Sequence, residues 1–209
     1  MSKQLVIIGA SGHGKVIADI AEKVGYTDIV FLDDDSTVAS CGNYKVVGGC
    51  QSALSYKKAD FIIAIGNTKI RRKIQSEFIE MGLHIVSLVH PSAVIASNVK
   101  IGVGSVVMAG AVINPWTEIG QGCIINTCAS VDHDCRIGDY VHVSVGAHVA
   151  GTVIIGDDTW IGAGATISNN IEIVADCMMG AGTVVLDKIL ESGTYVGVPA
   201  KQIKKGDAK

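Results

Sequence analysis

The stretch from residue 95 to residue 185 repeats with a period of six, and this repeat limits the possible folds more than any other feature of the chain. Every sixth residue in it is aliphatic or methionine, with no shift of frame. The sixteen positions are Ile95, Ile101, Val107, Ile113, Ile119, Ile125, Val131, Ile137, Val143, Val149, Ile155, Ile161, Ile167, Ile173, Met179 and Val185. Such a column predicts short strands stacked in coils, each burying its apolar residues against the neighbouring coils.

Glycines add a longer period of 18 to the same stretch. One series is Gly102, Gly120, Gly138 and Gly156, and a second pair is Gly162 and Gly180. A tight corner that recurs every 18 residues means three hexads per coil, so we expect a triangular parallel β-helix of about five coils.

The fifth place of each hexad is small or apolar, and three of the six cysteines lie there. Cys123, Cys135 and Cys177 are therefore predicted to be small buried core residues. Because no pair has CxxC spacing, the sequence indicates neither a zinc ribbon nor a redox pair, and we expect reduced thiols and no metal.

The first 90 residues have a different pattern, in which apolar strands alternate with helices. We expect strands at 5–8, 29–32, 61–65 and 85–89 and helices at 15–24 and 70–81. This alternation predicts a small Rossmann-like α/β domain with a parallel sheet over residues 1–90. Pro91 marks the junction, and the β-helix with its C-terminal tail takes residues 91–209.

Charge and hydropathy exclude several classes of partner. The formal net charge is −3 and the basic residues are scattered, so we expect no nucleic-acid partner. No secretory pattern and no uninterrupted apolar run of about 18 residues is present, so we expect a cytoplasmic protein without a membrane partner.

The segment GASGHGKV, residues 9–16, follows the first strand and resembles two phosphate-binding motifs without completing either. Val16 stands where a P-loop needs Ser or Thr for magnesium, and the glycine spacing differs from the dinucleotide fingerprint. A glycine turn before a helix N-terminus can still hold phosphate. We therefore expect a nucleotide-diphosphate site, while a turn that serves packing alone remains the alternative.

Several segments occur together in an order that is specific in combination: GASGHGKV, FLDDD, IAIGN, VHPSA, INTCASVDHDCRIGDYVHVSVGAHVAG and GVPAK. Over about residues 4–203 the chain resembles the PglD/NeuD-type acetyltransferases. Within them it is most similar to the N-acetyltransferases of nucleotide-linked 4-amino-4,6-dideoxy sugars, of the bacillosamine-pathway type. The resemblance implies a left-handed β-helix, a homotrimer, a nucleotide amino-sugar substrate, and acetyl-CoA bound between neighbouring subunits.

The same resemblance implies roles for particular residues. The catalytic histidine falls on His133, and Asp134 and Asn126 are the other two residues expected to be catalytic. The residues expected at acetyl-CoA are His142, Gly151, Gly162 and Gly180. Those expected at the nucleotide sugar are Gly9, Ser11, Gly12, His13, Asp33, Asp34 and Gly66. One departure is Asp134, where a close relative has glutamate, so a direct contact with the imidazole is left open.

The chemistry of these residues fits acetyl transfer to an amine. Histidine suits a general base near neutral pH, and a backbone amide can stabilise the thioester oxygen as it becomes anionic. His133 and Gly151 are 18 residues apart, so they should stack on successive coils. The alternatives are a sialic acid O-acetyltransferase, a sugar-binding module without activity, and a zinc lyase of the γ-carbonic-anhydrase type using His133, His142 and His148.

Overall fold

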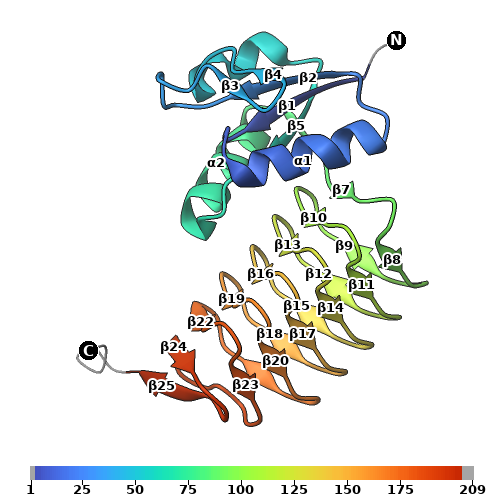
Figure 1. Cartoon of the computed structure of the whole chain (residues 1–209), viewed down its shortest axis with the longest axis vertical. Coiled ribbons are helices and arrows are strands. Elements are labelled where there is room, and N and C mark those ends of the chain that lie inside the picture. Colours follow the sequence, from blue (N-terminus) through green and yellow to red (C-terminus); the bar gives the residue numbers. More distant parts are fainter. Residues whose placement is uncertain (1–2, 204–209) are drawn as a thin grey trace. The chain divides into compact units, whose positions relative to one another are not determined.

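The computed structural model describes residues 3–203 and divides into two compact units, Met1–Pro91 and Ser92–Lys209 (Figure 1). Pro91, which the sequence pattern assigns to the start of the second domain, belongs to the first unit in this division. Among the described residues no helix has the length and apolar character needed to cross a membrane.

The first unit is a parallel α/β layer structure. Its main elements are β1 (Gln4–Ile8), α1 (Gly12–Lys23), β2 (Asp28–Leu32), β5 (Asp60–Ile63), α2 (Thr68–Glu80) and β6 (His84–Ile85). The strands form one sheet in the order β2-β1-β5-β6, and every pairing in it is parallel. Smaller elements are β3 (Ser40–Cys41), β4 (Tyr44–Lys45), the 3-10 helix η1 (Cys50–Tyr56) and β7 (Leu88–Val89).

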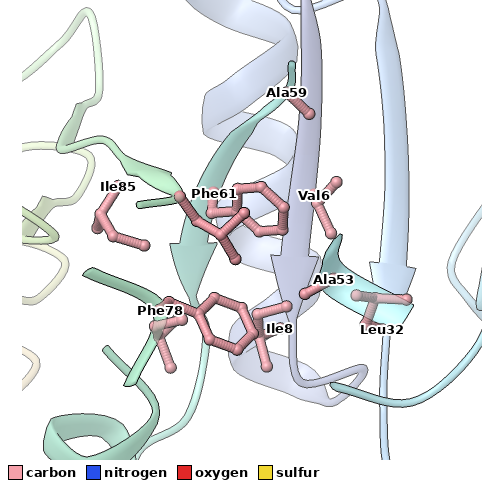
Figure 2. Packing of buried hydrophobic residues seen from close by; sticks show 10 residues of the cluster. Val6, Ile8, Leu32, Ala53, Ala59, Phe61, Phe78 and Ile85 are labelled. Atoms are coloured by element: carbon pink, nitrogen blue, oxygen red, sulfur yellow. The ribbon is translucent and has the colours of Figure 1, made fainter. Parts of the chain in front are cut away.

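The two faces of this sheet are covered by different helices. Val6 and Ile8 of β1 pack with Phe61 of β5 and with Phe78 of α2, and Figure 2 shows the two phenylalanines facing each other. Their rings meet edge to face with centroids 5.6 Å apart. Because strand side chains alternate between faces, the other buried residues of β1 point to the opposite side.

The second unit is a parallel β-helix with three faces, visible in Figure 1 as a stack of triangular coils. The first face contains β10 (Val106–Val107), β13 (Ile124–Ile125), β16 (His142–Val143), β19 (Trp160–Ile161), β22 (Cys177–Met179), β24 (Gly193–Val196) and β25 (Lys201–Ile203). The second contains β8 (Val94–Ile95), β11 (Val112–Ile113), β14 (Ser130–Val131), β17 (His148–Val149), β20 (Thr166–Ile167) and β23 (Val184–Val185). The third contains β9 (Lys100–Ile101), β12 (Glu118–Ile119), β15 (Arg136–Ile137), β18 (Ile154–Ile155) and β21 (Glu172–Ile173).

The hexad columns form the core of the β-helix, as the sequence predicts. From Val107 to Val185 every member of the sixfold aliphatic series is buried, and only Ile95 and Ile101 of the first coil are half-buried. Cys123, Cys135 and Cys177 are buried free thiols, which confirms their structural interpretation. Burial raises the pKa of the Cys135 and Cys177 thiols.

The glycines at intervals of 18 stand where two coils approach closely. A Cβ on Gly120 would lie 2.6 Å from the carbonyl carbon of Gly138 on the next coil. The same crowding holds at Gly102, Gly138 and Gly156. These glycines are therefore required by coil stacking.

A further series occupies the left-handed region of backbone conformation. Every sixth residue from Asn98 to Gly182 has a φ between +55° and +75°. At the corner between the first and second faces the residues are Gly110, Cys128, Gly146, Gly164 and Gly182; we call this the glycine corner. At the corner between the second and third faces they are Asn98, Trp116, Asp134, Thr152 and Asn170; we call this the histidine corner, because His133 lies in it.

Several element boundaries differ from the sequence predictions. Helix α1 begins at Gly12 rather than at Lys15, so the last two glycines of GASGHGKV form its first turn. The strand expected over 61–65 ends at Ile63, and the strand expected over 85–89 is divided into β6 and β7. The β3–β4 hairpin and η1 were not predicted, because such short elements carry little periodicity.

Candidate active site

The first unit holds a cavity where three parallel strands end. Strand β1 pairs with β2 on one side and with β5 on the other. The strand order therefore reverses direction at β1. Ligands of open α/β sheets bind at such a switch point. A cavity of about 260 Å³ lies there, and its lining includes five of the expected nucleotide residues: Gly9, Ser11, Asp33, Asp34 and Gly66.

A larger cleft of about 810 Å³ shares residues with this cavity. Asp33, Asp34 and Cys50 line both, and the cleft continues along residues 35–51. The two aspartates therefore stand between a small cavity at the strand ends and a wider space beyond it.

Glycine is required at two positions of the turn between β1 and α1. Gly9 has a φ of +104°, and a Cβ there would lie 2.9 Å from Cγ1 of Ile65. A Cβ on Gly14 would meet the carbonyl oxygen of Gly9 and would lie 2.9 Å from Cε1 of Phe31. These contacts give part of the motif a packing role beside any binding role.

The two aspartates fix the loops around the cavity, a role that the sequence did not reveal. Asp33 accepts hydrogen bonds from the backbone N–H of Ala10 at 2.7 Å and of Asp35 at 2.9 Å. Asp34 accepts one from the Cys50 N–H at 2.7 Å. A carboxylate can accept about four hydrogen bonds, so both groups keep capacity for a ligand.

His13 and Gly12 do not line the cavity, in contrast to their expected place at the nucleotide. His13 lies in the first turn of α1, and its Nε2 is buried without a hydrogen-bond partner among the described residues. Burial lowers the pKa of His13 to about 4, and the charge of Arg71 adds to this effect. The imidazole is therefore neutral near pH 7.

Arg71 supports the loop that follows β5. Its side chain is 1% exposed, and Nη1 donates to the carbonyl oxygens of Ile65 and Gly66, each at 2.9 Å. A buried guanidinium held by two carbonyls positions Gly66 at the cavity. No sequence motif marked Arg71 for this role.

In the second unit, His133 and Asp134 form a hydrogen-bonded pair at the histidine corner. Nδ1 of His133 lies 2.8 Å from Oδ2 of Asp134, and each side chain is 56% exposed. The left-handed backbone of Asp134, with a φ of 57°, belongs to the turn that makes this contact. The shorter acid therefore reaches the imidazole directly. The hydrogen bond, with the charges of Asp132 and Asp134, raises the pKa of His133.

Asp132 stabilises the same turn without contacting the imidazole. Its Oδ1 accepts hydrogen bonds from the His133 backbone N–H at 2.9 Å and from Nδ2 of Asn114 at 2.7 Å. Asn114 belongs to the preceding coil, so this carboxylate joins two coils at the histidine corner.

Gly151 lies beneath the imidazole on the next coil, where the spacing of 18 residues had placed it. A Cβ at Gly151 would stand 2.6 Å from Nε2 of His133, so glycine is the residue that allows this approach. Among the described residues no acceptor is hydrogen-bonded to the Gly151 N–H.

Asn126 and His142 form a second group, on the first face. Nδ2 of Asn126 lies 3.1 Å from Nε2 of His142, and the His142 ring stacks on Trp160 with centroids 4.8 Å apart. Strand β14 separates Asn126 from the His133 turn within one chain. The expected grouping of Asn126 with His133 and Asp134 is therefore not formed inside a single chain.

The other expected acetyl-CoA residues have packing reasons of their own. A Cβ on Gly162 would lie 2.7 Å from the carbonyl carbon of Gly180, and one on Gly180 would lie 2.8 Å from Cγ1 of Val196. Within residues 3–203 no group of three metal-ligating side chains is formed, and His142 and His148 lie on different faces.

Comparison with known proteins identifies relatives of both units. The model of the PglD N-terminal domain family matches residues 4–78. The UDP-N-acetylbacillosamine N-acetyltransferase of Bacillus subtilis (strain 168) is 35% identical over 112 residues. That match covers 51% of this chain and 51% of that protein, so the chain is aligned with about half of the relative's length.

Solved structures match over nearly the whole chain. The acetyltransferase domain of PglB from Neisseria gonorrhoeae FA1090, in complex with acetyl coenzyme A, is 39% identical, with a TM-score of 0.93, and 97% of this chain and 100% of that chain are covered. PerB from Caulobacter crescentus, in complex with CoA and GDP-perosamine, is 36% identical, with a TM-score of 0.90 and coverage of 96% and 97%. At this identity over this length, the chain belongs to the family of PglD-type acetyltransferases.

Proposed function

We propose that this protein is an acetyl-CoA-dependent N-acetyltransferase. Its acceptor is the 4-amino group of a 4-amino-4,6-dideoxy sugar linked to UDP, dTDP or GDP, in cytoplasmic synthesis of surface-glycan precursors. The observation that carries the proposal is the arrangement of His133, Asp134 and Gly151 at one corner of the β-helix. The relatives named above support the choice of amine acceptor and acyl donor.

His133 serves as the general base in this proposal. The tautomer that donates from Nδ1 to Asp134 leaves Nε2 free to accept a proton from the acceptor amine. As the nitrogen attacks the thioester carbonyl, the nitrogen–carbon bond forms and His133 takes the proton. Asp134 stabilises the resulting imidazolium, which agrees with the raised pKa of His133.

Collapse of the tetrahedral species breaks the carbon–sulfur bond and completes the reaction. His133 returns its proton to the departing sulfur, so the products are the sugar amide and CoA with a free thiol. The Gly151 N–H is the proposed donor to the developing oxyanion. No cysteine is needed as a nucleophile, since the amine attacks directly, and Cys123, Cys135 and Cys177 are buried.

We also propose a homotrimer in which two chains complete each site. Support comes from the separation of the two groups: His133 lies at the histidine corner, while Asn126 and His142 lie by the first face. A donor that contacts both groups has to lie between the histidine corner of one chain and the first face of another.

In the first unit, the proposed nucleotide site is the cavity at the ends of β1, β2 and β5. Gly9 and Ser11 precede the N-terminus of α1, where backbone N–H groups suit a diphosphate. Asp33 and Asp34 then offer acceptors to the ribose or base. His13, being neutral and buried, acts by shaping the turn rather than as a cation.

The decisive experiment measures thiol release from acetyl-CoA with a panel of acceptors: UDP-N-acetylbacillosamine, GDP-perosamine, dTDP-4-amino-4,6-dideoxyglucose and a free sialic acid. Transfer to one of the amino-sugar nucleotides is expected. Transfer only to a sialic acid hydroxyl would replace the proposal with O-acetylation, and zinc-dependent lyase activity without transfer would refute it.

Mixed trimers test the shared site. His133→Ala and Asn126→Ala trimers should each be inactive or weak, whereas mixed trimers formed by co-expressing the two chains should regain part of the wild-type rate. No restoration in mixed trimers would show that each chain works by itself.

A further inference from the structure

Trp116 is an exposed tryptophan in a strained conformation, directly next to the His133 pair in the coil stack. Its φ is 64° and its exposed fraction is 65%. A bulky residue in the left-handed region is an outlier that persists only where the surrounding structure or the function requires it. Within residues 3–203 the indole makes no hydrogen bond or ring contact.

Tyr140 shows how such strain is offset when the role is structural. It has a φ of 58° at the corner between the third and first faces, but it is 1% exposed. Its ring covers Gly122, where an added Cβ would be in collision with it. Burial of a large ring offsets the strain at Tyr140, whereas nothing comparable offsets it at Trp116 in the part of the chain that the structure describes.

The backbone fixes Trp116 beside the catalytic pair. Trp116 and Asp134 occupy the same place in successive coils, whose strands are paired in register through Glu118 and Arg136. The Asp134 N–H donates to the carbonyl oxygen of Pro115 at 3.1 Å. Neighbouring coils are about 4.8 Å apart, so an indole at this place reaches the space in front of His133.

The residues around Trp116 are held by side chains as well. Nδ2 of Asn114 donates to Asp132 at 2.7 Å, and the same carboxylate oxygen binds the His133 N–H. The segment that carries Trp116 and the segment that carries His133 therefore form one rigid corner. A movement of Trp116 relative to His133 would break these hydrogen bonds.

We infer that Trp116 is a positioning and specificity-determining residue for the acceptor sugar. Its indole packs against the apolar side of a deoxy sugar, including the C6 methyl group, and holds the 4-amino group towards Nε2 of His133. His133 stands between Trp116 on the preceding coil and Gly151 on the following one. Because the Gly151 N–H is the proposed donor to the thioester oxygen, we place the acceptor sugar on the Trp116 side of His133. This inference rests on the proposed function.

The test compares Trp116→Asn with Trp116→Phe, and Asp176→Gly serves as the matched control. Asparagine tolerates the left-handed region, so the variant keeps its fold, while phenylalanine keeps an aromatic face. Asp176 has a φ of 57° at another corner, so its replacement relieves strain without touching the site. For Trp116→Asn we expect the KM for the amino-sugar nucleotide to rise roughly tenfold or more with an unchanged KM for acetyl-CoA.

Phenylalanine should recover part of this loss, and the control should match the wild type. Light scattering must show the same oligomer for all variants. An unchanged acceptor KM in Trp116→Asn, a change in the acetyl-CoA KM instead, or dissociation of the oligomer would each overturn the inference. Absence of transfer in the wild type with every acceptor would instead count against the proposed function.

A binding measurement distinguishes failure of the Trp116 inference from failure of the proposed function, because binding can be measured without catalysis. Calorimetry compares GDP-perosamine with GDP and UDP-N-acetylbacillosamine with UDP. Trp116→Asn should weaken binding of the sugar nucleotide that the wild type prefers, while the affinity for the bare nucleotide stays the same. Equal affinities of the variant and the wild type for both ligands, or an equal loss for both, would overturn the inference.

Discussion

The histidine corner and the glycine corner of the β-helix share one backbone conformation but carry different residues. At the glycine corner, four of the five left-handed positions are glycine. At the histidine corner none of the five is glycine, and all five side chains are exposed. The left-handed region costs an L-residue roughly 1–2 kcal/mol, which glycine avoids. The histidine corner therefore keeps an exposed side chain in every coil at a cost in stability that the glycine corner avoids in four coils of five.

The largest effect expected at the histidine corner is loss of the base. His133→Ala should lower kcat by about 10²–10⁴-fold, because no group remains to take the proton from the amine. The side chain is 56% exposed, so the fold and the binding of CoA should be preserved. Steady-state thiol release and CoA calorimetry measure the two effects; full activity in this variant would refute the role of His133.

A smaller effect is expected when the partner of His133 is changed. Asp134→Asn keeps a residue that tolerates a φ of 57°, so folding should not change. Activity at neutral pH should fall roughly tenfold with the loss of a hydrogen bond to a charged group.

The pH profile gives the sign of this interaction. Asp134 raises the pKa of His133, and a base works only above its own pKa. In Asp134→Asn the acid limb of the kcat/KM profile should therefore move to lower pH. A shift to higher pH, or none, would show that Asp134 does not govern the titration of His133.

The cost of side chains at the two corners can be compared by exchanging residues. Gly146 has a φ of 60° and open space around an added Cβ, so Gly146→Thr should lose about 1–2 kcal/mol of unfolding free energy from backbone strain alone. Thr152→Gly, the reverse change at the histidine corner, should raise the unfolding free energy by up to about 1 kcal/mol, because the strain relieved exceeds the entropy that glycine adds to the unfolded chain. Denaturant unfolding at one protein concentration tests both; a stable Gly146→Thr would remove the basis of the comparison.

Cys128 is the exception at the glycine corner and gives the smallest expected effect. Cys128→Gly restores the residue found at the other four positions, and it should stabilise the protein by about 0.5 kcal/mol. The same unfolding series measures it. A clear loss of stability would mean that the thiol makes a contact worth more than the strain.

The sequence predicted the β-helix well because its cause is local and repeated. Each hexad buries the residues at the same two of its six positions, so the core from Val107 to Val185 can be listed from the sixfold period alone. It missed the left-handed series, although the glycine, asparagine and aspartate at every sixth position from Asn98 would have indicated it. Four residues interrupt that pattern, and a composition rule for turns does not anticipate them: Trp116, Cys128, Tyr140 and Thr152.

The candidate site was predicted in its residues more than in its contacts. The spacing of 18 residues predicted that His133 stacks on Gly151. It did not predict that β14 separates Asn126 from His133 within one chain. In the first unit the cavity gathered Gly9, Asp33 and Gly66 as expected. The burial of Arg71 and the low pKa of His13 depend on tertiary burial and on the nearby charge of Arg71, which no local motif encodes.

The most direct test of the account is a crystal structure of the protein with CoA and an amino-sugar nucleotide that it acetylates. The account predicts the acceptor nitrogen at the histidine corner, within about 2.6–3.2 Å of Nε2 of His133. An acceptor nitrogen bound at the glycine corner, or out of reach of His133, would contradict it.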